Sequence, residues 1–173
     1  MKRLVTLALV ALALMALAWG FLQWMPKARA ANDEAAIRQL LDRWGSAFRA
    51  KDLNAIMSNY VPGPDLVAFD ILPPLKRVGA EAYRKNYQEF FDQYAGSIDY
   101  EIRDLRIVTG DGVAFLHGLE RITGTMKNGQ KSEAWVRVTS GLRKINGKWL
   151  IMHDHVSVPA DLETGKAALD LKP

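Results

Sequence analysis

The chain has 173 residues, no cysteine, and 23 Lys and Arg residues against 19 Asp and Glu residues. The lack of cysteine excludes disulfide scaffolds, thiolate zinc sites, iron–sulfur clusters and a cysteine nucleophile. Four of the basic residues and none of the acidic ones lie in residues 1–30, so residues 31–173 carry 19 of each sign and no formal net charge. A neutral domain without a basic run offers no electrostatic footprint for a phosphate backbone, so we expect no nucleic-acid partner.

Residues 1–30 have the pattern of an export signal. Two basic residues follow Met1, residues 4–22 carry no charge, and the small-x-small tripeptide Ala28-Arg29-Ala30 precedes Ala31. This pattern predicts a signal peptide that is cleaved after residue 30, and a periplasmic or secreted protein. The apolar run is also close to the roughly 20 residues that span a bilayer. An uncleaved membrane anchor that faces the periplasm is therefore the alternative, with this segment as the only contact with the membrane.

Apolar residues recur at helical spacing in the first half of the remaining chain. They predict a long helix over residues 33–50 that is capped by Asn32-Asp33, and a short second helix over residues 53–60. A third helix follows Gly79 and is expected to end near Gly96. The brief apolar stretch between the second and third helices, residues 66–71, has the composition of a strand.

After Gly96 the apolar residues alternate, which indicates strands. The alternation slips at Arg103-Asp104, and this predicts a bulge that bends the sheet. Residues 160–173 have the composition of a loose polar tail. The predicted strands are 98–109, 113–126, 130–144 and 148–159, joined by turns at Gly110-Asp111-Gly112, Asn128-Gly129 and Asn146-Gly147. The sequence thus predicts an α+β domain over residues 31–159, with three N-terminal helices packed on one face of a strongly bent antiparallel sheet.

This order of elements resembles the nuclear transport factor 2-like (NTF2-like) superfamily, most closely its SnoaL-like and ketosteroid-isomerase-like members. The resemblance spans residues 35–159, and the last segment is also similar to the association domain of calcium/calmodulin-dependent kinase. It implies a cone-shaped fold with an enclosed pocket for a small hydrophobic ligand, and no cofactor. It also implies general acid/base isomerase, cyclase or dehydratase chemistry, or else a noncatalytic ligand-binding or oligomerisation module. The segments that carry the resemblance are Ala50-Lys51-Asp52-Leu53, Phe69-Asp70, Val78-Gly79 and residues 147–159.

The catalytic groups of ketosteroid isomerase transfer only in part. The resemblance places the general base on Asp70, but the oxyanion tyrosine falls on Trp44 and the second acid falls near Thr139 or Ser140. A base without its oxyanion donors lacks what is usually the largest catalytic contribution. We therefore expect no steroid isomerisation.

Asp70 and the three histidines are the candidate catalytic residues. Asp70 stands in an apolar stretch, where it serves as a general base if it points inward or caps a turn if it does not. Strand alternation places His153 and His155 on the same face as Trp149, which we take as the pocket wall. His117 is expected to join them, and Arg137 to hold an anionic or carbonyl group. The predicted ligand-binding residues are Trp44, Tyr60, Phe69, Tyr87, Trp135 and Arg137.

The histidines have two other interpretations. They can form hydrogen bonds within the sheet or at a subunit interface, or His153 and His155 can bind a metal ion with Asp70 or His117. The spacing lacks a fuller metal-binding signature, so we predict no metal site.

The opposite face of the predicted sheet is apolar. Left in water, so large an apolar surface is a site for association. The sequence therefore predicts a homodimer or larger ring built on this face. The residues on it are Ala134, Val136, Val138, Leu150, Met152, Val156 and Val158.

Overall fold

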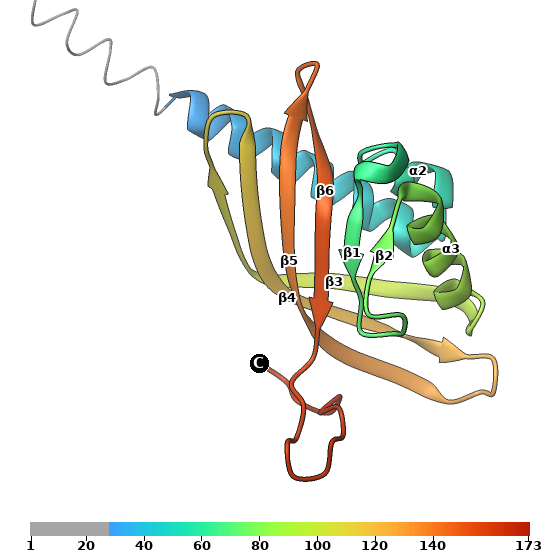
Figure 1. Ribbon diagram of the computed structural model, residues 1–173. Coiled ribbons are helices and arrows are strands. Elements are labelled where there is room, and N and C mark those ends of the chain that lie inside the picture. The colour runs from blue at the N-terminus through green and yellow to red at the C-terminus, as the bar shows by residue number, and fades with distance from the viewer. Residues whose placement is uncertain (1–27) are drawn as a thin grey trace, which may run out of the picture.

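The computed structural model describes residues 28–173 (Figure 1). Most of the predicted leader, residues 1–27, lies outside this range, and residues 28–30 form the beginning of a helix. Among the helices of residues 28–173, none combines the length and the apolar character that crossing a membrane requires.

The helices lie along one side of a long sheet (Figure 1). The first is helical throughout residues 28–50, followed by α2 (Leu53–Met57), a 3₁₀ turn (Gly63–Asp65) and α3 (Ala80–Phe91). The predicted start of the first helix at Asp33 is wrong, because Asp33 does not cap it. Its buried carboxylate instead accepts hydrogen bonds from Lys144 Nζ at 2.6 Å and Trp149 Nε1 at 3.2 Å.

Six strands form one curved sheet in the order β2-β1-β6-β5-β4-β3. The four long strands match the predicted segments closely. They pair antiparallel as predicted, and the short strand β1 adds to β6 in parallel, so the six-stranded sheet is mixed. The helices and this sheet together make the α+β cone that the sequence predicts. The strands are β1 (Val67–Phe69), β2 (Arg77–Val78), β3 (Tyr94–Thr109), β4 (Val113–Met126), β5 (Lys131–Ile145) and β6 (Lys148–Ser157).

Three register shifts interrupt the long strands, and one of them lies between Tyr94 and Ile98 at the start of β3. The predicted bulge is confirmed, since the β3–β4 register shifts between Arg103 and Arg106 and Asp104 adopts a φ of 53°. The third shift lies in β6, where Gly141 pairs with His153 and Leu142 pairs with Ile151, so that Met152 is an extra residue. An extra residue reverses the alternation of the side chains that follow it. The odd-numbered side chains of β6 therefore face the helices before Met152, and the even-numbered ones face them after it.

The core fills the space between the helices and the concave side of the sheet. Aromatic rings form much of it: Trp44 stacks on Phe48 with centroids 5.0 Å apart, and Phe48 meets the edge of Phe91 at 5.2 Å. The residues after β6 are not the loose tail that composition suggests. They turn back on themselves, and Ala160 pairs with Ala167 in an isolated bridge.

Candidate functional site

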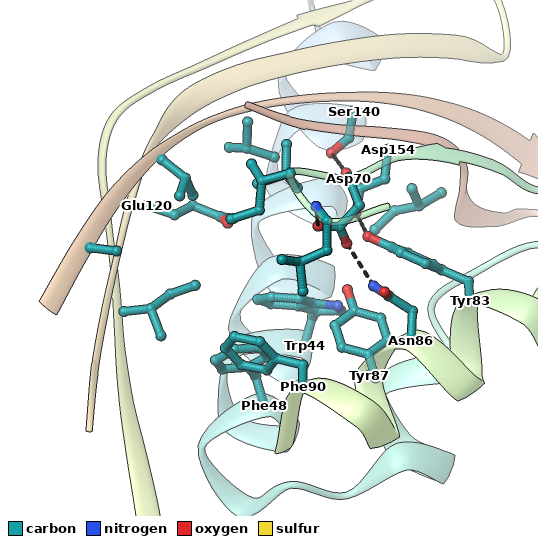
Figure 2. Close-up of a pocket in the computed structure, with 18 of the residues that line it drawn as sticks. Trp44, Phe48, Asp70, Tyr83, Asn86, Tyr87, Phe90, Glu120, Ser140 and Asp154 are labelled. Carbon is teal, nitrogen blue, oxygen red and sulfur yellow. Dashed lines mark hydrogen bonds between the residues drawn. The ribbon is translucent and has the colours of Figure 1, made fainter. Parts of the chain in front are cut away.

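A cavity of about 280 Å³ lies between the helices and the concave face of the sheet (Figure 2). Aliphatic and aromatic side chains make up most of its wall. The polar groups come from the segment after α2, from the end of β1, from α3 and the start of β3, and from the inward faces of β4, β5 and β6. The polar residues that line it are Tyr60, Asp70, Tyr83, Asn86, Tyr87, Gln93, Tyr94, Glu120, Ser132, Ser140 and Asp154.

Four of the predicted site residues line this cavity. They are Asp70, Trp44, Tyr60 and Tyr87, and they come from different parts of the chain. Tyr60 is held in place because its backbone pairs with Ile151 of β6. The structure thus brings together the expected general-base candidate and three of the expected aromatic residues.

The other six predicted residues do not line the cavity. His153 and His155 follow the extra residue in β6, so they point to the outer face, whereas Trp149 and Ile151 before it point inward as predicted. The prediction that the histidines form the pocket wall is therefore wrong. The residues that the structure places away from the cavity are His117, His153, His155, Phe69, Trp135 and Arg137.

On the outer face these residues contact one another. His153 Nδ1 lies 2.9 Å from the carbonyl oxygen of Val67, and its ring meets Phe69 with centroids 4.9 Å apart. His155 meets the same phenylalanine at 5.7 Å. Hydrogen bonding within the sheet, the alternative interpretation of the histidines, thus describes His153. Within residues 28–173, no group of three or more acidic or histidine side chains is arranged to hold a metal ion.

The remaining outward residues belong to β4 and β5. His117 is exposed beside Phe115, and the ring of Trp135 lies under the guanidinium of Arg103, 5.0 Å from its centroid. Arg137 is exposed, which contradicts the expectation that it holds a ligand in the pocket. The alternation of β5 explains the exposure of Arg137, because its neighbours Val136 and Val138 are buried on the opposite face of the strand.

Much of the apolar face that we expected to drive assembly lies inside the molecule, since four of its seven residues line the cavity. Because alternate residues of β5 point inward, three of its side chains face the helices rather than solvent. The argument for a dimer from this face is therefore wrong. Its residues that line the cavity are Ala134, Val136, Val138 and Val156.

Asp70 lies at the edge of the cavity, just after β1. Its Oδ2 accepts a hydrogen bond from Asn86 Nδ2 at 2.6 Å, and its Oδ1 accepts a longer one from the backbone N–H of Leu72 at 3.3 Å. The second contact is the turn-capping role that the sequence left open. The side chain also lines the cavity, so this contact does not remove Asp70 from the candidates for a general base.

Asp154 is buried at the centre of a hydrogen-bond network. Its Oδ2 accepts from the hydroxyls of Tyr60 at 3.0 Å and Tyr83 at 3.1 Å, and its Oδ1 accepts from Ser140 Oγ at 2.6 Å. Since Tyr60 donates to Asp154, the Tyr87 hydroxyl, 2.8 Å away, donates to Tyr60. Burial raises the pKa of Asp154, and the three donors act in the opposite direction.

The indole of Trp44 belongs to the same network. Its Nε1 donates to the Tyr60 hydroxyl at 3.1 Å, so its single donor is already used. At the position that corresponds to the oxyanion tyrosine of ketosteroid isomerase, this chain therefore has no free donor. The expectation that the isomerase site is not reproduced agrees with this geometry.

Glu120 is the second buried acid, with 8 % of its surface exposed. Its Oε1 accepts a hydrogen bond from the Tyr100 hydroxyl at 2.7 Å. Burial and then the negative charge of Asp154 raise the pKa of Glu120 from 4.5 to about 8. Glu120 is therefore protonated near neutral pH, and it enters the cavity on the side away from Asn86 and Tyr83 (Figure 2).

Asp154 and Glu120 were not among the predicted site residues, although the sequence contains a signal for both. Asp154 is the one acid among the apolar residues of its strand phase, and Glu120 shares a strand phase with Leu116 and Ile122. An acid within the apolar phase of a strand is costly to bury without a partner, so it marks a polar network or a site. Tyr83 and Asn86 carry no such signal, because a helical aromatic stripe resembles ordinary core.

Residues 37–161, which include most of the fold and nearly all of the cavity lining, match the model of the SnoaL-like domain family. This protein belongs to that family. A comparison with curated proteins found no match. The SnoaL-like assignment fits the fold, in which three helices cover a bent, unclosed sheet.

Solved structures agree with the SnoaL-like assignment. An NTF2-like protein of unknown function from Pseudomonas putida KT2440 is 33 % identical, with a TM-score of 0.75 over 83 % of this chain and 99 % of that one. A ketosteroid isomerase-like protein from Erwinia carotovora atroseptica SCRI1043 is 25 % identical, with a TM-score of 0.61 over 71 % and 93 %. A Xanthomonas campestris protein, named for the calcium/calmodulin-dependent protein kinase II association domain, is 25 % identical, with a TM-score of 0.63 over 73 % and 87 %.

Proposed function

We propose that this SnoaL-like domain binds a small, uncharged and mostly apolar molecule in its cavity and moves a proton on it, with Asp70 as the general base. One observation supports this most strongly. A single apolar cavity holds the Asp70 carboxylate at its edge and the protonated Glu120 on another side. A protonated carboxyl group that shares a cavity with a second carboxyl group is a common arrangement for general acid/base chemistry.

The charges around the cavity favour an uncharged ligand. Its lining includes Asp70, Glu120 and Asp154, and no Lys, Arg or His among residues 28–173. None of the three acids forms a salt bridge within that range. A carboxylate or phosphate ligand would meet like charge without a basic partner, and burying it would be costly. An apolar molecule with a carbonyl or hydroxyl group meets no such cost.

The proposed chemistry uses Asp70, whose oxygens each accept one hydrogen bond and keep a further lone pair, and the second oxygen of Glu120. Asp70 accepts a proton from a carbon next to the carbonyl, while Glu120 donates a hydrogen bond to the carbonyl oxygen as negative charge develops there. Each such group typically contributes about 10²- to 10⁴-fold to a rate. Isomerisation, cyclisation and dehydration all include a step of this kind.

The test follows proton exchange on a ketone that has this chemistry. In D₂O, wild-type protein is expected to speed the exchange of the protons next to the carbonyl of 4-phenyl-2-butanone, observed by NMR. Asp70→Asn keeps the side-chain volume and removes the base, so exchange should fall to the rate without protein. Ketone affinity and melting temperature should change little. Asp99→Asn, at an exposed aspartate of β3 outside the cavity, is the matched control and should behave as wild type.

Two results would contradict the catalytic assignment. Exchange that survives Asp70→Asn would show that Asp70 is not the base. Binding of the ketone by wild type without any exchange would favour a noncatalytic ligand-binding module, the function class that the likeness to an association domain suggests.

A further inference from the structure

The chain after β6 contributes to the cavity wall. β6 ends at Ser157, and a tight turn follows in which the N–H of Gly165 donates to the carbonyl of Asp161 at 2.8 Å. The returning chain is held where the N–H of Ala168 donates to the carbonyl of Pro159 at 2.8 Å. This return brings Leu169 into the set of residues that line the cavity. We call residues 158–173 the C-terminal segment.

An ion pair joins the end of this segment to the sheet. Lys172 Nζ lies 3.1 Å from Oε2 of Glu133 on β5, whose other oxygen accepts from Arg121 Nε at 2.9 Å. The hydrogen bond from Lys172, followed by the one from Arg121, lowers the pKa of Glu133, so the carboxylate stays ionised. The segment therefore extends from the end of β6 to β5, and Figure 1 shows it beyond the lower end of β6.

Leu169 lies among other half-exposed apolar side chains that line the cavity. Ile71 and Leu72, in the loop after β1, are 41 % and 39 % exposed, and Leu169 is 50 % exposed. A side chain that both lines a cavity and reaches solvent marks the rim of that cavity. The match to the SnoaL-like family ends at residue 161, so Leu169 and Lys172 lie beyond the part of the chain that the family accounts for.

We propose that the C-terminal segment completes the ligand site, with Leu169 as its outer wall and the Lys172–Glu133 ion pair as the contact that holds the wall in place. The inference rests on the proposed function only in that the cavity takes a small apolar molecule. Ligand exchange then requires the segment to move away from the rim. Leu169 thereby controls both the affinity for apolar ligands and the rate at which they leave.

The experiment measures how fast an apolar probe leaves the full-length protein. N-phenyl-1-naphthylamine, an uncharged fluorophore, is bound and then displaced by excess 4-phenyl-2-butanone in a stopped-flow instrument. Leu169→Ala should raise its dissociation rate about tenfold, because part of the apolar wall around the probe is removed. The control is Leu162→Ala, which alters a leucine of the same segment that is 94 % exposed and does not line the cavity.

A second variant tests the ion pair. Exposed ion pairs are weak and are screened by salt, so Lys172→Gln, which removes the charge without placing a second acid beside Glu133, should raise the dissociation rate by about two- to threefold at low salt and make that rate independent of salt. The melting temperatures of all three variants should match that of wild type. A faster dissociation rate would then reflect the lost contact at the rim and not a general loss of stability.

The outcomes distinguish this inference from the proposed function. Equal dissociation rates for wild type and Leu169→Ala, with the probe bound in both, would overturn the role of the C-terminal segment and leave the cavity as a ligand site. A probe that does not bind wild type would overturn both. A probe dissociation rate that Leu162→Ala and Leu169→Ala raise equally would also overturn the proposed role of Leu169, because the effect would not depend on contact with the cavity.

Discussion

Glu120 is a residue whose protonation differs between the folded and the unfolded chain. Its pKa rises from 4.5 to about 8 because it is buried and close to Asp154. Above pH 4.5 the unfolded chain releases this proton while the folded protein keeps it, so the free energy of unfolding falls as pH rises toward 8 and then levels off. Glu120 therefore stabilises the fold most at acidic pH.

A substitution of Glu120 tests this linkage. Glu120→Gln keeps the acceptor for Tyr100 and cannot ionise, so the decline in stability from pH 5 to pH 8 should be smaller by on the order of 4 kcal/mol. Urea unfolding of both proteins at the two pH values measures the difference. Parallel pH profiles for wild type and variant would show that Glu120 is not buried as an acid.

The extra residue of β6 determines which side chains reach the cavity. Met152 reverses the alternation, so that Asp154 and Val156 face inward while His153 and His155 face outward. Deletion of Met152 should leave His153 pointing outward and Asp154 inward, because without the extra residue these side chains alternate directly with Ile151. The hydrogen bonds of Asp154 should then survive, so the deletion is expected to cost far less than the roughly 3 kcal/mol or more that loss of this network would cost. Thermal unfolding measures this, and a destabilisation of that size would contradict the assigned register.

Strand and helix positions could be predicted from the sequence because they depend on local signals. Turn pairs such as Asn146-Gly147, which adopt φ angles of 50° and 80°, fix where the strands end. The bulge at Asp104 left a visible slip in the apolar pattern. The one at Met152 did not, since apolar residues occur on both sides of β6. Strict alternation therefore predicts the wrong face for His153 and His155. For the same reason it places Asp154 away from the cavity.

At the scale of the whole molecule, the outer face of the sheet carries the exposed aromatic and imidazole side chains. Phe69 and Phe115 are 40 % and 47 % exposed there, near His153, His155 and His117. We propose that a homodimer or larger assembly forms through this face. Light scattering at micromolar concentration should then give at least twice the mass of one chain. A monomer mass would contradict it, and Phe115→Asp should weaken the assembly without altering the cavity.

Export is the other whole-molecule proposal. We propose that residues 1–30 direct the chain across a membrane and are removed, which leaves a periplasmic or secreted domain beginning at Ala31. Intact-mass analysis of protein made in a Gram-negative host should show the loss of these residues. Full-length protein in the membrane fraction would support the anchor instead.

The central claim is that a protonated Glu120 meets an uncharged ligand in the cavity. NMR titration of 4-phenyl-2-butanone from pH 6 to pH 10 tests it most directly. Wild-type affinity should be constant at the acidic end and fall about tenfold per pH unit above the Glu120 pKa of about 8, because only the protonated acid donates to the carbonyl. Glu120→Gln, which keeps an N–H donor, should bind with the same affinity throughout. Wild-type affinity that does not change over this range, or an equal fall in the variant, would contradict the account.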